Sequence, residues 1–337
     1  MRAAVLSLLV GWIGLGASTA YATPARIAAL SNNGGFIDDT DFFRYPSALK
    51  AQPSRAALNY GGAFDGGLIL DGDTKQAFFL QRHSVGGALP DLSLGGVGGF
   101  QALYGRASGS SGFLIRAAQN PNTPAFSIGG AWSNGPGKGN VQNLAIDGDL
   151  VIFNNLVDED QDNDLGIRLG VTGRTLTSDR LTVWNARFSL DTLNEQAVLH
   201  GGYTLGPRFR NDDVRIAMQL GPVLNVIIPV GDNNAAPGLG FDIPFGNFAG
   251  EYLLREWFVI RGSLTAAWAA TVSNLEEDAI DNLSFGPRLG GAFGVGFKHK
   301  QAQFDMTVNP TWVQNGPHVL SGVSNPMFAV LSARVDL

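Results

Sequence analysis

The feature that most constrains the fold of this chain is a strict alternation of apolar and polar residues over long segments. In residues 302–313, Phe304 and Val308 fall on one face, whereas Asp305 and Thr307 fall on the other. A side-chain period of two is that of a β-strand, whose successive side chains point to opposite faces of a sheet. Comparable alternation recurs in residues 111–118, 124–132, 141–153, 163–174, 181–190, 195–206, 213–227, 241–253, 256–271, 283–298 and 326–337.

Two all-β folds use such strands, a soluble β-sandwich and a transmembrane β-barrel. The segments have about the 9–11 residues or more that a tilted membrane crossing needs. Their polar face is mostly Gly, Ser, Thr, Asn and Arg, whereas a solvated surface is rich in Lys and Glu. Glycine accounts for 45 of the 337 residues and charged residues for only 15%, below the usual share in soluble domains. The pattern therefore predicts an all-β, transmembrane antiparallel β-barrel in the outer membrane of a Gram-negative-type cell.

The number of strands is less tightly constrained than the fold class. Bacterial outer-membrane barrels have an even number of strands, and residues 56–82 fit one, two or three crossings. We expect about 14 strands, with 12 or 16 as the neighbouring solutions.

The C-terminal segment ends in an apolar row. Leu331, Ala333, Val335 and Leu337 alternate with polar residues up to the last position. The row resembles the C-terminal β-signal that the barrel-assembly machinery reads in outer-membrane proteins, although those usually end in Phe or Trp. The resemblance implies that this machinery and outer-membrane lipid are partners of the chain. The net charge of −6 gives no support for nucleic-acid binding.

Residues 1–22 have the pattern of a cleaved signal peptide. Arg2 precedes an apolar run over residues 3–16, and Ala20-Tyr21-Ala22 supplies the small residues that signal peptidase reads. An uncleaved membrane anchor is the alternative, but the run is short for a crossing. The chain has no cysteine, so we expect neither disulfides nor a lipid-attachment cysteine. The expected parts are a signal peptide at 1–22, a plug-like segment at 23–54 and the barrel at 55–337.

Residues 23–54 do not alternate, and they carry acidic and aromatic residues ahead of the first strand. The residues concerned are Asp38, Asp39, Asp41, Phe42, Phe43 and Tyr45, followed by Pro46-Ser47-Ala48-Leu49. This stretch resembles the N-terminal motif of the FadL and PorV-like barrels, with Tyr45 where that motif has Asn and Ala48 where it has Gly. The resemblance implies fourteen strands, an N-terminal segment inside the lumen, and passage of hydrophobic compounds or a role in secretion. An ordered periplasmic leader is the alternative.

Charged residues recur on the predicted inner face of the strands. A row of arginines that faces carboxylates is how many porins build a transverse field over their constriction. A structural network of paired charges that fills a closed barrel is the alternative, because buried charges need partners. The predicted lumen-lining set is Arg116, Arg168, Arg187, Arg215, Arg261, Arg288, Arg334, Asp147, Asp149, Asp305 and Asp336.

An acidic repeat lies in a predicted outer loop. Asp158, Asp160, Asp162 and Asp164 recur at every second position, a spacing of hard oxygen ligands that suits Ca²⁺. Asn163 stands where an EF-type loop has Gly, and Leu169 stands where it has Glu. A solvated acidic loop is the alternative, and we expect no other cofactor.

Three function classes remain for such a barrel. The first is a passive channel or transporter for small, and on the FadL resemblance hydrophobic, solutes. The second is a closed barrel that serves a structural role or a secretion partner. The third and least expected is a barrel hydrolase, since the chain has four histidines and neither a G-x-S-x-G nor an H-E-x-x-H motif. We therefore expect that the chain is not an enzyme.

Overall fold

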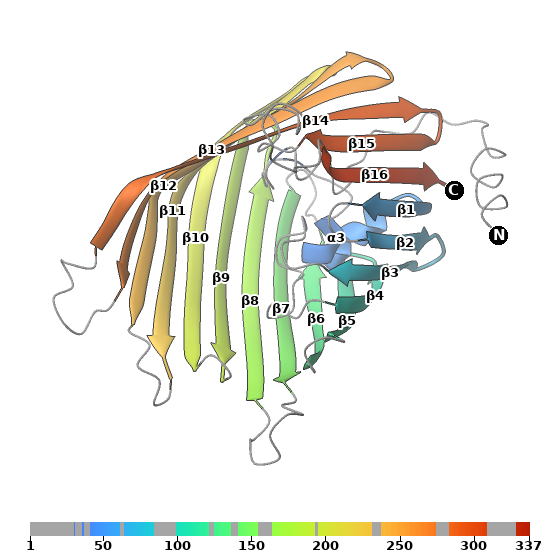
Figure 1. Cartoon of the computed structure of the whole chain (residues 1–337). Coiled ribbons are helices and arrows are strands. Elements are labelled where there is room, and N and C mark those ends of the chain that lie inside the picture. Colours follow the sequence, from blue (N-terminus) through green and yellow to red (C-terminus); the bar gives the residue numbers. More distant parts are fainter. Residues whose placement is uncertain are drawn as a thin grey trace, which may run out of the picture.

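The chain forms one closed, antiparallel β-barrel of sixteen strands in the computed structural model (Figure 1). Each strand pairs with its neighbours in sequence, and β1 pairs with β16 to close the ring. The structure describes residues 30, 36, 41–60, 64–83, 99–120, 125–135, 141–153, 164–192, 195–230, 237–273, 283–308 and 328–337. The strands are β1 (Arg55–Tyr60), β2 (Phe64–Leu70), β3 (Lys75–His83), β4 (Gly99–Ser108), β5 (Ser111–Asn120), β6 (Ala125–Asn134), β7 (Val141–Phe153), β8 (Asp164–Leu176), β9 (Arg180–Asp191), β10 (Gln196–Arg210), β11 (Val214–Pro229), β12 (Gly238–Arg255), β13 (Phe258–Ser273), β14 (Leu283–His299), β15 (Ala302–Val308) and β16 (Phe328–Asp336).

The closed antiparallel barrel agrees with the sequence prediction, but the strand number corrects it. The expected value of about 14 is too low; sixteen, which was a neighbouring solution, is the number in the ring. Residues 56–82 fall in three strands, β1 to β3, and β4 was not expected at all. These strands show no clear alternation, because apolar residues occupy both of their faces. Phe78 is exposed, whereas Phe79 and Leu103 are buried.

Exposure along the later strands follows the expected alternation. Leu169 on β8 is 56% exposed, while Thr172 is buried. On β16, Leu331 is exposed and its neighbours Ser332 and Arg334 are buried. Apolar side chains therefore cover the outer surface of the barrel, and polar side chains on these strands face its interior.

All the strand connections that the structure describes in full lie at one end of the barrel. This end, which we call the short-turn end, carries the connections at 71–74, 109–110, 177–179, 211–213, 256–257 and 300–301. The described parts of β3, β7, β13 and β15 run to the opposite end. At the short-turn end the backbone N–H of Leu337 donates to Ser54 O at 2.9 Å, which fixes the C-terminus beside the start of β1.

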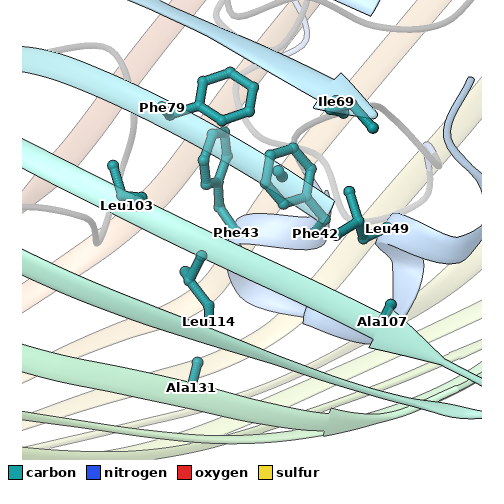
Figure 2. Packing of buried hydrophobic residues seen from close by; sticks show 10 residues of the cluster. Phe42, Phe43, Leu49, Ile69, Phe79, Leu103, Ala107, Leu114 and Ala131 are labelled. Carbon is teal, nitrogen blue, oxygen red and sulfur yellow. The ribbon is translucent and has the colours of Figure 1, made fainter. Parts of the chain in front are cut away.

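Two short helical elements lie inside the ring (Figure 1). They are α3 (Asp41–Arg44) and the 3₁₀ helix η1 (Pro46–Ala51), and η1 packs against β3 to β6. Within the described part of the chain, no helix is long and apolar enough to cross a membrane. The inner wall of β2 to β6 is apolar where these elements touch it, so this side of the barrel has a hydrophobic core. Figure 2 shows that core, which consists of Phe42, Phe43, Leu49, Ile69, Ala77, Phe79, Leu103, Ala107, Leu114 and Ala131.

A second apolar cluster lies against the neighbouring wall. Leu30 and Phe36 of the N-terminal segment are buried among inward residues of β8, β9, β11 and β12. The wall residues of this cluster are Leu176, Leu181, Ala217 and Ala249. The N-terminal segment is thus held by apolar contacts to both sides of the lumen.

Candidate functional site: the charged lumen wall

The first charged network joins three strands around one carboxylate. Asp149 on β7 has a fully buried side chain and accepts hydrogen bonds from Arg116 on β5 and Arg168 on β8. Arg168 Nη2 lies 2.5 Å from Asp149 Oδ2, and Arg116 Nε lies 2.5 Å from Asp149 Oδ1. Asp147 completes the group at 3.9 Å from Arg116 Nη2. Charge-assisted, bidentate bonds of this kind are the strongest that side chains form, and they offset the cost of burying the ions.

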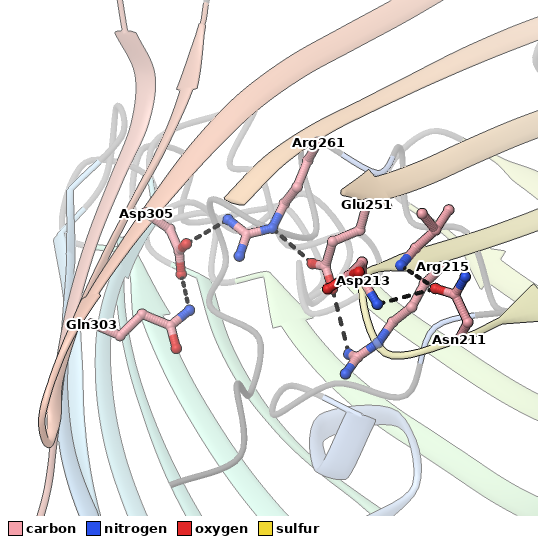
Figure 3. Close-up of polar contacts among 8 residues, drawn as sticks. Asn211, Asp213, Arg215, Glu251, Arg261, Gln303 and Asp305 are labelled. Atoms are coloured by element: carbon pink, nitrogen blue, oxygen red, sulfur yellow. Dashed lines mark hydrogen bonds and ion pairs between the residues drawn. The ribbon is translucent and has the colours of Figure 1, made fainter. Parts of the chain in front are cut away.

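The second network crosses the opposite wall (Figure 3). Arg261 on β13 donates from Nε to Glu251 Oε2 at 2.8 Å and from Nη1 to Asp305 Oδ1 at 2.5 Å. Arg215 on β11 reaches the other oxygen of Glu251 at 3.4 Å. Gln303 donates to the remaining oxygen of Asp305 at 2.6 Å. The arrangement alternates positive and negative groups across β11 to β15, so each buried charge has an opposite charge beside it.

Glycine makes both networks sterically allowed. Gly129 on β6 lies in register between Arg116 and Asp149, and a Cβ at Gly129 would overlap Asp149 Oδ1. Gly296 on β14 lies in register with Asp305, and a Cβ there would overlap Asp305 Oδ1 and Arg261 Nη1. Charged side chains from two strands can therefore meet across the strand between them only where that strand has a glycine.

A third set of contacts ties the N-terminal segment to the wall. Arg174 on β8 donates from Nη1 and Nη2 to the two carboxylate oxygens of Asp41, at 2.9 and 2.8 Å. The same guanidinium lies over the ring of Tyr45, 4.7 Å from its centroid. Ser47 Oγ accepts a hydrogen bond from Ser133 Oγ on β6 at 2.8 Å. Burial raises the pKa of the Tyr45 phenol and outweighs the opposing effect of Arg174, so the phenol stays neutral at ordinary pH.

The predicted lumen-lining residues face inward, and the structure divides them into separate groups. Arg116, Arg168, Asp147 and Asp149 form the first network, and Arg215, Arg261 and Asp305 belong to the second. Arg334 Nε lies 3.4 Å from Asp336 Oδ1 at the end of β16.

The two remaining predicted arginines lie on β14 and β9. Arg288 is 66% exposed and pairs with Asp242 at 3.6 Å. Arg187 lies in register with His200, whose Nδ1 is 2.6 Å from Asn225 Oδ1.

Sequence reasoning missed Arg174 and Glu251 as site residues. The alternation of residues could have placed both on the inner face. Arg174 follows Arg168 and Thr172 on the inner face of β8, and Glu251 lies on the same face of β12 as Asn247. Of the predicted plug residues, Asp41, Phe42, Phe43 and Tyr45 make the contacts described above. Asp38 and Asp39 lie outside the described residues.

The calcium prediction falls almost entirely outside the described residues. Asp158, Asp160 and Asp162 are not among them, and Asp164 begins β8. The predicted signal peptide at 1–22 also lies outside them. Within the ranges given above for the barrel and its N-terminal elements, no group of three His, Cys, Asp or Glu side chains could hold a metal ion.

Comparisons with known proteins give fold-level likenesses. No family model matches the chain, and no curated protein matches it significantly, so the FadL resemblance stays a prediction. OmpT, an outer membrane protein of Vibrio cholerae, shares 10% identity over 83% of this chain and 94% of its own, with a TM-score of 0.42. The FrpB iron transporter from Neisseria meningitidis shares 9% identity over 80% of this chain and 47% of its own, with a TM-score of 0.28. Likenesses this remote carry no argument about function, and the barrel rests on its own strand pairing.

Proposed function

We propose that this protein is an outer-membrane channel for small polar solutes, narrowed at its short-turn end by the N-terminal segment. The observation that carries the proposal is that α3 and η1 lie inside a sixteen-strand ring and pack on its inner wall. Barrels of roughly 16–18 strands enclose more space than their own inward side chains fill. A segment inside such a ring therefore controls how much of the lumen solute can use.

Two features support a place in the outer membrane. The ring is closed, so no strand edge exposes unpaired backbone groups to lipid. Its outer surface carries large apolar side chains, among them Phe285, Leu289 and Leu264. The signal-peptide pattern at 1–22 is consistent with export. In the usual orientation of such barrels, the short-turn end faces the periplasm.

The inner surface supports polar rather than hydrophobic solutes. Both of its apolar parts are already covered: the one on β2 to β6 by Phe42, Phe43 and Leu49, and the one on β8 to β12 by Leu30 and Phe36. The remaining wall carries the charged networks and polar side chains such as Gln219 and Asn247. In the part of the lumen that the structure describes, no uncovered apolar surface remains for the hydrophobic solute that the FadL resemblance implies.

Deleting residues 25–50 while keeping the signal peptide tests this function. The variant should still insert and should show a higher single-channel conductance in planar bilayers, because the obstruction is gone. Heat-modifiable gel mobility provides the control for correct folding. A correctly folded deletion variant with wild-type conductance would contradict the proposal.

A closed barrel with a structural or secretion role is the second candidate. It is favoured by the burial of the charged networks, since Arg116, Asp149, Arg261 and Asp305 are all nearly inaccessible. The same deletion distinguishes the two candidates. A closed barrel would not conduct with or without the segment, whereas a narrowed channel would conduct more without it.

A further inference from the structure

Four arginines converge on the inner face of the barrel at its short-turn end. Arg174 is the last inward residue but one of β8, Arg208 and Arg210 end the inward row of β10, and Arg215 begins that of β11. Arg210 and Arg215 are direct cross-strand partners in the β10–β11 register. Like charges in this position repel each other, which destabilises a strand pair that has nothing else to offset the repulsion.

Arg208 brings the four groups together across β9. Its Nη1 donates to Thr177 O in the β8–β9 turn at 2.8 Å, so the side chain leans toward the end of β8, where Arg174 stands. The charges that act on Arg208 are those of Arg210, Arg174 and Arg215, and all three are positive. Arg208 is half-buried and Arg210 is exposed, so the cluster is open to a ligand from the end of the barrel.

The carboxylates that the structure describes near this cluster pair with Arg174 and Arg215 and leave Arg208 and Arg210 without one. Asp41 binds Arg174, and Glu251 is shared between Arg215 and Arg261. Within the described residues, neither Arg208 nor Arg210 forms an ion pair. Asp212 and Asp213 of the β10–β11 turn line a cavity of about 60 Å³ beside Arg215, and no ion pair joins them to Arg208 or Arg210 in that same part of the chain.

A half-buried guanidinium without a counter-ion is costly, because desolvation is not repaid by an opposite charge. The planar fork of arginine matches oxyanions, which accept two parallel N–H bonds. Of the five N–H donors on Arg208, the structure uses one, for Thr177 O. The cluster therefore has unused N–H donors, positive charge and access from the end of the barrel, and an oxyanion site requires all three.

We propose that Arg208 and Arg210, supported by Arg174 and Arg215, bind a small multivalent oxyanion such as phosphate at the short-turn end of the lumen. The site does not depend on conduction, because a closed barrel would bind the anion equally. In a conducting barrel it would favour anions at the inner mouth.

The test uses the full-length protein in a phosphate-free detergent. Inorganic phosphate, added at constant ionic strength against chloride, should raise the thermal unfolding midpoint in a saturable manner. Arg208→Gln should abolish that increase, and without phosphate the variant should be at least as stable as the wild type, because a repulsive charge is gone. Arg288→Gln is the matched control, since Arg288 is also inward but lies far from the cluster; it should keep the full increase.

Two outcomes would overturn the proposal. The first is an equal response to phosphate and chloride, which would mean that salt only screens the charges. The second is an Arg208→Gln variant that loses stability without phosphate yet keeps the phosphate increase, which would make Arg208 a purely structural partner of Thr177. Adding phospholipid in place of inorganic phosphate separates the sources of the anion: stabilisation by phospholipid alone would show a lipid headgroup site and contradict a site for free oxyanion.

Discussion

At the scale of single residues, the barrel interior is organised by charges that need each other. Arg261 touches two carboxylates on two other strands, so its removal would take a charge-assisted hydrogen bond from each of two buried carboxylates, Glu251 and Asp305. A buried charge that loses its partner costs much more than an exposed pair contributes. Arg288 provides the contrast, because it is 66% exposed and its contact with Asp242 is long.

Arg261→Ala should therefore lower the free energy of unfolding by about 3–5 kcal/mol. Arg288→Ala should lower it by no more than about 1 kcal/mol. Denaturant unfolding in lipid vesicles, followed by tryptophan fluorescence, measures both variants. Equal losses in the two would show that the Glu251–Arg261–Asp305 network is not buried as described.

At the scale of elements, alternation identifies a strand only where the two faces meet different surroundings. It predicted β5 to β16 because lipid-facing residues there are apolar and inward residues are polar. It left the number of strands open for β1 to β3 and did not identify β4, because the inward residues Ile69, Phe79 and Leu103 pack on the N-terminal segment. Both faces of these strands are apolar, because the outer face meets lipid and the inner face meets the N-terminal segment. The residue pattern of one strand does not show that another segment covers its inner face.

The same difference between faces gives a prediction for one strand position. Leu169→Arg, near the middle of β8, should cost about 2–4 kcal/mol because the charge enters the apolar part of the bilayer. Ser284→Arg, on the exposed inner face of β14, should cost little because water in the lumen solvates it. Folding yield and unfolding midpoint in vesicles test the pair. Similar losses for both would mean that the assigned faces are wrong.

At the scale of the whole molecule, the sequence indicated which residues face inward but not which of them meet. Period two places Arg116 and Asp149 on the inner face; their contact depends on Gly129 between them and on the register of three strands. The N-terminal segment differs from the strands in its lack of alternation and its aromatic residues. Its anchor, Arg174, was not singled out because its partner Asp41 lies 133 residues earlier.

The central claim is that the N-terminal segment lies inside the closed barrel, against the inner face of β6. Because the chain has no cysteine, a disulfide between introduced cysteines reports this position without background. Ser47 and Ser133 share a hydrogen bond of 2.8 Å between their Oγ atoms, so cysteines at these two positions would bring their thiols together, as a disulfide requires. Trp132, the next residue on β6, is exposed and points to the outer surface.

The decisive measurement is disulfide formation in membranes isolated from cells, read as a reductant-sensitive gel shift of the unfolded chain. The variant with Ser47→Cys and Ser133→Cys should cross-link nearly completely. The control with Ser47→Cys and Trp132→Cys should not, because the barrel wall separates the two thiols. Failure of the first pair, or equal cross-linking of both, would contradict the placement of the segment in the lumen and the proposed channel with it.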